Sequence, residues 1–346
     1  MCAKTHYGNE YSQAAGSAVM RGSQDPSIAT LDRRCPTLPE LPPAPPGRTG
    51  WPWTIETPQL PDAMPDGRPW PRISIVTPSY NQGQFIEETV RSVLLQGYPN
   101  LEYIVMDGGS ADGSVDIIRK YEQWLTRWES GPDGGQARAI NLGFGTATGQ
   151  IMNWLNSDDY LLSNALGTIA LVFRSAPGVD LYIGTNLQIW FDQQNLSHHL
   201  TVASATIASR WPRIRFGVCG VPQDAAFFSK HMWNSAGPLE ISLNYGFDTH
   251  FFSKVQLQAR KIALGSEVLS VMRRHDKQKT FEHYHASTKE KAPDIVSITR
   301  VQMLLRRLLA SRLSTYIDTI LEFICSRRRR GVFFVRVNPL SRVDLD

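Results

Sequence analysis

Residues 73–107 read ISIVTPSYNQGQFIEETVRSVLLQGYPNLEYIVMD. A short apolar run at 73–77 is followed by a stretch with helical periodicity at 84–96 and by a second apolar run at 101–106. Apolar runs that alternate with helical periodicity are typical of βα units in a parallel sheet. We therefore predict two strands with a helix between them.

The same alternation continues along the chain and predicts an α/β fold with a mostly parallel, Rossmann-like sheet flanked by helices. Further helices are predicted at 112–123, 136–147, 163–174 and from about 247, and further strands at 125–130, 150–155, 179–184, 187–191, 224–229, 261–264 and 267–273. Ligands of open α/β sheets bind beyond the carboxyl ends of the strands. The loops at 77–81, 107–112 and 156–159 are thus expected to meet at one site.

Composition limits the class of protein. The 346 residues are 42% hydrophobic, which is enough for a substantial core, and a net charge of +4 argues against a dedicated nucleic-acid binder. The four cysteines lie far apart, without the spacing of a zinc site or a disulfide framework. With no apolar run of about eighteen residues, we expect a cytoplasmic chain that does not span a membrane.

Two flanking segments differ from this central region. Residues 1–71, with twelve prolines between 36 and 71, are predicted to form a flexible extended arm, although Trp51, Trp53 and Trp70 could dock it on the domain. Residues 281–346 hold a basic amphipathic helical segment that ends in Arg327–Arg330. Its apolar stripe could pack on the domain, or the segment could rest on the inner face of the cell membrane through anionic lipid.

The polar stretch Asn156-Ser157-Asp158-Asp159 follows the predicted strand at 150–155. Adjacent acidic residues before a helix often act as N-caps, and that interpretation stays open. Carboxylates at the end of a buried strand are nevertheless costly without a cation. Hard oxygen ligands suit Mg²⁺ or Mn²⁺, which complete their shells with water and phosphates. The stretch is therefore a candidate metal and diphosphate site.

Two glycine-containing loops are candidate ligand sites. Asp107 precedes Gly108-Gly109 and is either a turn residue or an acceptor for a nucleobase or sugar, with the glycines letting the ligand approach. The loop at 131–136, which includes Gly135, precedes a helix that carries Arg138. It is either an ordinary loop-to-helix connection or a binding site for a diphosphate at the helix N-terminus.

Two later residues complete the candidate chemistry. Asp248 lies among aromatic residues at a predicted helix start, so it is either an N-cap or a general base whose basicity burial would raise. His275, in the basic sequence Arg273-Arg274-His275, is either a surface residue or a ligand of a metal or diphosphate.

From Ile73 to about Lys279 the chain resembles the family 2 glycosyltransferases, inverting enzymes of the GT-A fold that use nucleotide-diphosphate sugars. Three segments carry the resemblance: residues 73–121, beginning ISIVTPSYNQ; GPDGGQARAINLGFGTATGQIMNWLNSDDYL at 131–161; and AAFFSKHMWNSAGPLEISLNYGFDTHFF at 225–252. They place the chain in the branch of the family whose metal motif reads NSDD. The resemblance implies a GT-A domain at 72–280, with a nucleotide-binding half at 72–160 and an acceptor half at 161–280.

The resemblance also implies roles for individual residues. It places the donor nucleotide against Thr77, Pro78, Tyr80, Asp107, Gly108, Gly135, Arg138, Asn156 and Asp158. It gives Mn²⁺ or Mg²⁺ to Asp158, Asp159 and His275, and it makes Asp248 the catalytic base. Asn156 departs from the family because an acid often stands there, the block at 221–228 is atypical, and no second acid adjoins Asp248.

The implied function is inverting transfer of a sugar, most simply from a UDP-sugar, to a hydroxyl of a sugar, glycan or lipid-linked acceptor in polysaccharide or glycoconjugate synthesis. One alternative is a catalytically degenerate protein that only binds sugar nucleotides. The other is a sugar nucleotidyltransferase, which would need a basic loop after the first strand, and Pro78–Gly83 contains no basic residue.

Overall fold

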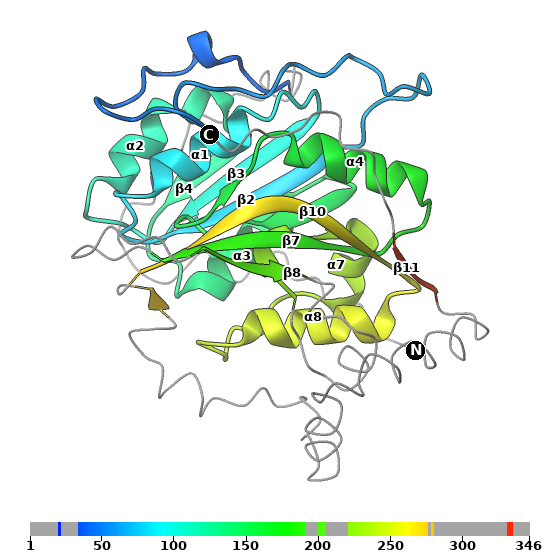
Figure 1. Ribbon diagram of the computed structural model, residues 1–346. Coiled ribbons are helices and arrows are strands. Elements are labelled where there is room, and N and C mark those ends of the chain that lie inside the picture. The colour runs from blue at the N-terminus through cyan, green and yellow to red at the C-terminus, as the bar shows by residue number, and fades with distance from the viewer. Residues whose placement is uncertain are drawn as a thin grey trace.

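The computed structural model describes residues 20–21, 34–190, 200–204, 221–275, 278–279 and 331–334. Its described strands form one sheet in the order β1-β4-β3-β2-β5-β9-β7-β10-β11, with β6 paired to β10 and β8 paired to β7. Helices cover both faces of this sheet (Figure 1). The expected α/β class is confirmed.

The first half of the sheet is parallel, as predicted. Its strands are β2 (Ile73–Ser79), β3 (Leu101–Asp107), β4 (Arg127–Ser130) and β5 (Ile151–Trp154). The intervening helices are α1 (Ile86–Leu94), α2 (Ser114–Lys120), which a short 3₁₀ turn η3 (Glu122–Trp124) follows, and α3 (Gln136–Thr146). All the carboxyl ends of these strands therefore lie at one edge.

The second half mixes directions. Strand β9 (Ala226–Ser229) runs antiparallel between β5 and β7 (Leu181–Trp190), and β7 pairs in parallel with β10 (Lys261–Arg274). The remaining helices are α4 (Ala165–Ser175), α7 (Lys230–Ala236), α8 (Phe247–Gln258) and the 3₁₀ turns η2 (Leu38–Glu40) and η4 (Gln223–Ala225). The remaining strands are β1 (Met20–Arg21), β6 (Tyr160–Leu161), β8 (Leu200–Ser204) and β11 (Gly331–Phe334).

Two separate apolar layers hold the sheet. One layer packs α1, α2 and α4 against one face, and the other packs α3, α7 and α8 against the opposite face (Figure 1). In the second layer, Trp154 of β5 lies 5.4 Å from Phe252 of α8 between ring centroids. This packing fixes the end of β5, the strand that carries the candidate metal motif.

The proline-rich segment at 34–71 differs from the predicted flexible arm, because it packs on the domain. Leu41 and Trp70 are buried in the same layer as α1 and α4. Arg91 of α1, only 1% exposed, donates to the carbonyls of Pro42, Pro52 and Trp53. An extended proline-rich chain leaves its carbonyls without ladder partners, and a buried guanidinium supplies the donors. The docked alternative therefore holds for this segment.

The predicted basic segment at 281–346 lies outside the described residues, apart from strand β11. Its membrane contact stays a prediction. The helices among the described residues are all too short or too polar to span a bilayer.

Candidate active site

The loops that follow β2 and β3 are joined to each other. The Asn81 N–H donates to Ser110 Oγ at 2.8 Å, and Asn81 Oδ1 accepts the Ala111 N–H at 3.0 Å. Asn81 has a left-handed backbone with φ of 52°, a conformation that asparagine tolerates better than most residues. These hydrogen bonds join the two loops, as the sequence predicts.

Asp107, the predicted base reader, is buried at the end of β3 with its carboxylate occupied by donors. Its Oδ2 accepts the N–H groups of Gly109 and Ser110 and the hydroxyl of Ser130, at 3.0, 2.9 and 2.7 Å. Its Oδ1 accepts the Ser110 hydroxyl at 2.6 Å. Thr77, also predicted at this edge, is buried and its hydroxyl lies 3.1 Å from that of Tyr103. Both side chains are engaged within the fold.

Tyr80, Gly108 and Asp133 meet at the surface next to Asp107. A Cβ placed on Gly108 would stand 3.1 Å from Asp133 Oδ2 and 3.2 Å from Tyr80 Cδ2, and the Tyr80 side chain is 63% exposed. Burial raises the pKa of Asp133, the charge of Asp107 adds to that rise, and Arg138 opposes it. Gly135, at the start of α3, donates its N–H to Asp133 Oδ1 at 2.7 Å. Asp133 was missed from the sequence because it reads as a turn residue.

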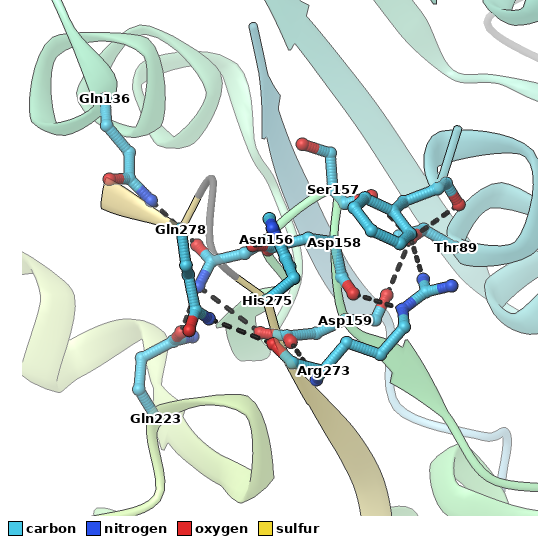
Figure 2. Close-up of polar contacts among 11 residues, drawn as sticks. Thr89, Gln136, Asn156, Ser157, Asp158, Asp159, Gln223, Arg273, His275 and Gln278 are labelled. Carbon is cyan, nitrogen blue, oxygen red and sulfur yellow. Dashed lines mark hydrogen bonds and ion pairs between the residues drawn. The ribbon is translucent and has the colours of Figure 1, made fainter. Parts of the chain in front are cut away.

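Asp158 and His275 form the centre of the candidate metal site. Asp158 Oδ2 lies 3.2 Å from His275 Nε2, although the two residues are 117 positions apart in the chain (Figure 2). Both are at most 8% exposed, and the His275 ring lies 4.6 Å from the ring of Phe85. Among the described residues, nothing hydrogen-bonds to the buried His275 Nδ1.

The Asp159 carboxylate forms its hydrogen bonds with Arg273 and Asn156 and not with that pair. It is wholly buried, and its Oδ1 accepts the backbone N–H of Arg273 at 3.0 Å. Burial raises the pKa of Asp159 well above its ordinary value, with further contributions from the charges of Asp158 and Asp224. Sequence reasoning placed both aspartates on the metal, whereas the structure brings only Asp158 against His275.

Arg273 holds the motif in place from β10. Its guanidinium lies against the rings of Phe85 and Tyr160 and donates to the carbonyl of Asp158. It also forms an ion pair with Glu88 of α1 at 2.7 Å, with both side chains largely buried. Sequence reasoning missed this role, although an arginine that ends a long apolar strand is an available signal.

Thr89, the neighbour of Glu88 on α1, binds the same loop. Its hydroxyl lies 2.9 Å from the carbonyl of Ser157 and 2.6 Å from that of Asp159 (Figure 2). Thr89 of helix α1 and Arg273 of strand β10 therefore both hydrogen-bond to the backbone of the loop 156–159.

Asn156 sits between two glutamine amides. Gln136 Nε2 donates to Asn156 Oδ1 at 2.9 Å, and Asn156 Nδ2 donates to Gln223 Oε1 at 3.2 Å and approaches Asp159 Oδ2 at 3.4 Å. Gln223 in turn donates to the carbonyl of Trp154. Because an aspartate could not donate to Gln223 or Asp159, this chain of amides explains why the family's frequent acid is an asparagine here.

The Asp158 and His275 pair fits a divalent cation. Adjacent ligands of an octahedral Mg²⁺-type site, each about 2.1 Å from the ion, stand about 3.0 Å apart, close to the separation seen here. Among the described residues no group of three histidine, cysteine or acidic side chains gathers. Such ions often use one or two protein ligands and take the remainder from water and substrate phosphates.

Asp248, the predicted base, stands in the first turn of α8 and is half-buried. Burial raises the pKa of its carboxyl, whose Oδ1 accepts the Thr249 N–H at 2.7 Å. No described hydrogen bond or ion pair joins it to Asp158 or His275. Residues 278–279 bridge the two regions, because Gln278 donates to the Arg273 carbonyl at 3.0 Å and the Lys279 ammonium lies 5.2 Å from the Tyr245 ring.

Comparison with known proteins finds sequence similarity to glycosyltransferases. The sequence model described as "Glycosyl transferase family 2" matches residues 74–220. An uncharacterized glycosyltransferase of Mycobacterium tuberculosis is 26% identical over 195 residues, which cover 56% of this chain and 72% of the relative. The putative teichuronic acid biosynthesis glycosyltransferase TuaG of Bacillus subtilis is 40% identical over 92 residues, which cover 26% of this chain and only 36% of TuaG.

Among solved structures, the chain is similar to S. aureus TarS in complex with UDP-GlcNAc. The TM-score is 0.49 at 18% identity, and the match covers 75% of this chain and 74% of the TarS chain. A Pyrobaculum calidifontis mannosyltransferase in complex with GDP-Man and Mn²⁺ matches at a TM-score of 0.49 and 17% identity, covering 77% of each chain.

Proposed function

From the match of residues 74–220 to glycosyl transferase family 2, we propose that the chain is a metal-dependent, inverting glycosyltransferase. It moves a sugar from a nucleotide diphosphate, UDP in the simplest case, to an acceptor hydroxyl. The name of TuaG favours an acceptor that is a glycan or a lipid-linked sugar of polysaccharide synthesis.

One observation carries the proposal, namely the contact of Asp158 with His275 at the carboxyl ends of β5 and β10. The fold brings a carboxylate and an imidazole from distant parts of the chain into one buried pair and leaves His275 Nδ1 without a partner among the described residues. Buried polar atoms in native proteins are nearly always satisfied. A bound cation and diphosphate would satisfy this pair.

The residues of this chain then divide the work. Asp158 and His275 would hold Mn²⁺ or Mg²⁺ with the donor diphosphate, and the cation would offset the negative charge that grows on the leaving group. Asp159, Arg273 and Thr89 keep the loop in place from behind. Gly135 and Arg138 lie at the N-terminus of α3, where a phosphate is favoured by the helix dipole.

Asp248 is the proposed general base. Its carboxylate takes the proton of the acceptor hydroxyl as that oxygen attacks the anomeric carbon from the face opposite the nucleotide, and the bond to the diphosphate oxygen breaks. Inversion follows from the single displacement. Because burial raises the pKa of Asp248, the carboxylate is more basic than in water and is better suited to this transfer.

A panel of UDP-, GDP- and dTDP-sugars, with and without Mn²⁺, tests the proposal through release of the nucleoside diphosphate. We expect release with at least one donor, strict dependence on the metal, and inverted product. Asp248→Asn should abolish release while leaving donor binding nearly unchanged. Binding without release in the wild type would indicate the degenerate binding protein instead, and release of pyrophosphate would indicate a nucleotidyltransferase.

A further inference from the structure

The carboxylate of Asp107 is committed to its own loop. Four hydrogen bonds reach it, from two backbone N–H groups and two serine hydroxyls, and it is only 3% exposed. A carboxylate offers about four lone-pair directions, so these donors use nearly all of its capacity. Asp107 therefore shapes the loop at 107–110, and a different group has to face the ligand.

Asp133 is a half-buried acidic side chain beside this loop. Its Oδ1 accepts the Gly135 N–H, and its Oδ2 and the Tyr80 ring lie on the same side of Gly108. Because Gly108 has no Cβ, the exposed Tyr80 ring and the Asp133 carboxylate can both lie close beside it. A flat heterocycle would stack on the Tyr80 ring and present its edge to Asp133.

We propose that Asp133 reads the base of the donor nucleotide and selects bases that carry a ring N–H on the pairing edge. Uracil, thymine and guanine have this donor, whereas cytosine and adenine present a ring nitrogen acceptor, which a carboxylate repels. The inference rests on the proposed function, because it assigns the base subsite of that same donor site. Gly108 lets the Tyr80 ring and the Asp133 carboxylate lie close together, and the exposed Tyr80 ring can stack on any base.

Binding of UDP and CDP by calorimetry in the presence of Mn²⁺ tests the assignment. The wild type should bind UDP more tightly than CDP. Asp133→Asn keeps an acceptor for the Gly135 N–H and adds an amide donor that cytosine can use. The UDP preference should fall by about tenfold or more, the worth of one hydrogen bond to a charged group.

Two matched variants separate the residues. Asp107→Asn should lower the melting temperature and weaken UDP and CDP by the same factor, because it damages the loop and not the edge of the base. Gly108→Ala should weaken UDP but not Mn²⁺-pyrophosphate, which has no base. The added methyl group would stand 3.1 Å from Asp133 Oδ2 and 3.2 Å from Tyr80 Cδ2, so it should displace the two groups that are proposed to meet the base.

The outcomes are distinct. An unchanged UDP to CDP ratio in a folded Asp133→Asn protein that still binds UDP would overturn the assignment and leave the proposed function standing. A changed ratio in Asp107→Asn alone would return base reading to Asp107. If the wild type bound Mn²⁺-pyrophosphate but no nucleoside diphosphate more tightly, the base subsite would be wrong; if it bound neither, the proposed function itself would fail.

Discussion

The loop at 156–159 has an outer side and an inner side, which differ in how completely their polar groups are hydrogen-bonded. On the outer side, Asp158 meets His275, whose Nδ1 has no partner among the described residues. On the inner side, Asp159 is wholly enclosed and its region is filled with hydrogen bonds from Arg273 and Asn156. Two consecutive, chemically identical residues thus have different surroundings, and under the proposed function only Asp158 would face the ligand. Mutations on the two sides should separate activity from stability.

The largest effect is expected on the inner side. Arg273→Met removes the cation that pairs with Glu88 and the donor to the Asp158 carbonyl, and it leaves Glu88 buried without its partner. Breaking a buried pair in this way costs about 3 kcal/mol or more in the free energy of unfolding. Denaturant unfolding measures it. The matched control is Arg119→Met, which breaks an exposed pair with Asp116 and should cost well under about 1 kcal/mol. Equal losses would show that the inner side has no special importance.

On the outer side, Asp158→Asn should leave stability nearly unchanged and reduce metal-dependent nucleotide release by about a hundredfold, comparable to the loss of one group that stabilises developing charge. The variant keeps the size of the side chain and removes its charge. Release and the melting temperature are measured on the same preparation. A variant that is destabilised but retains its specific activity would show that Asp158 serves stability and not activity.

Asn156→Asp tests the boundary between the sides. The new carboxylate would lose the donation to Gln223 and would stand beside Asp159, at the position of an amide now 3.4 Å from Asp159 Oδ2. We expect a loss of about 1–2 kcal/mol in the absence of metal, the cost of an unsatisfied buried group. Unfolding in EDTA and in Mn²⁺ measures it, and the loss should shrink with metal. A more stable variant in EDTA would contradict the role of the amide chain.

The smallest effect concerns Asp224, which is wholly buried and bonded to Asn186 and Ser270. Burial raises the pKa of Asp224 in the folded protein, so the folded state holds this proton more tightly than the unfolded chain does. Stability from this group is therefore greatest in acid and is lost as the pH rises from the ordinary carboxyl pKa through the raised one. Asp224→Asn should melt a few degrees higher at neutral pH, with a gain that vanishes toward acid. A gain in melting temperature that grew toward acid would show that the pKa of Asp224 is lowered in the folded protein, not raised.

Local pattern was sufficient for the first half of the sheet and less so for the second. Strands β2, β3 and β5 were predicted because each is a buried run bounded by turn residues, and β4, which alternates between half-buried and buried residues, was predicted as a short strand. Strands β7 and β10 were each predicted as two strands, because a polar or glycine residue interrupts the apolar run; β10 continues through register shifts between Leu264 and Ser270. Helix α7 was missed, although Ser229 caps it by accepting the Met232 N–H.

The candidate site was predictable in residue type but not in side-chain direction. The polar residues after β2, β3 and β5 could be assigned to one edge because parallel strands end together. Asp159 is engaged by Arg273, 114 positions further along the chain, which leaves Asp158 as the one against His275, and no local pattern encodes that contact. The docking of the segment at 34–71 likewise depends on Arg91, 49 positions beyond Pro42.

Arg91 also determines how much of the N-terminal sequence the folded domain needs. Its buried guanidinium donates to the carbonyls of Pro42, Pro52 and Trp53 and to the Tyr121 hydroxyl, so three of its four partners lie between β1 and β2 in the chain. A chain trimmed to start at the family match would bury a charge that lacks those carbonyls, which is costly. A fragment that folds on its own therefore has to include the proline-rich segment from Pro42 onward.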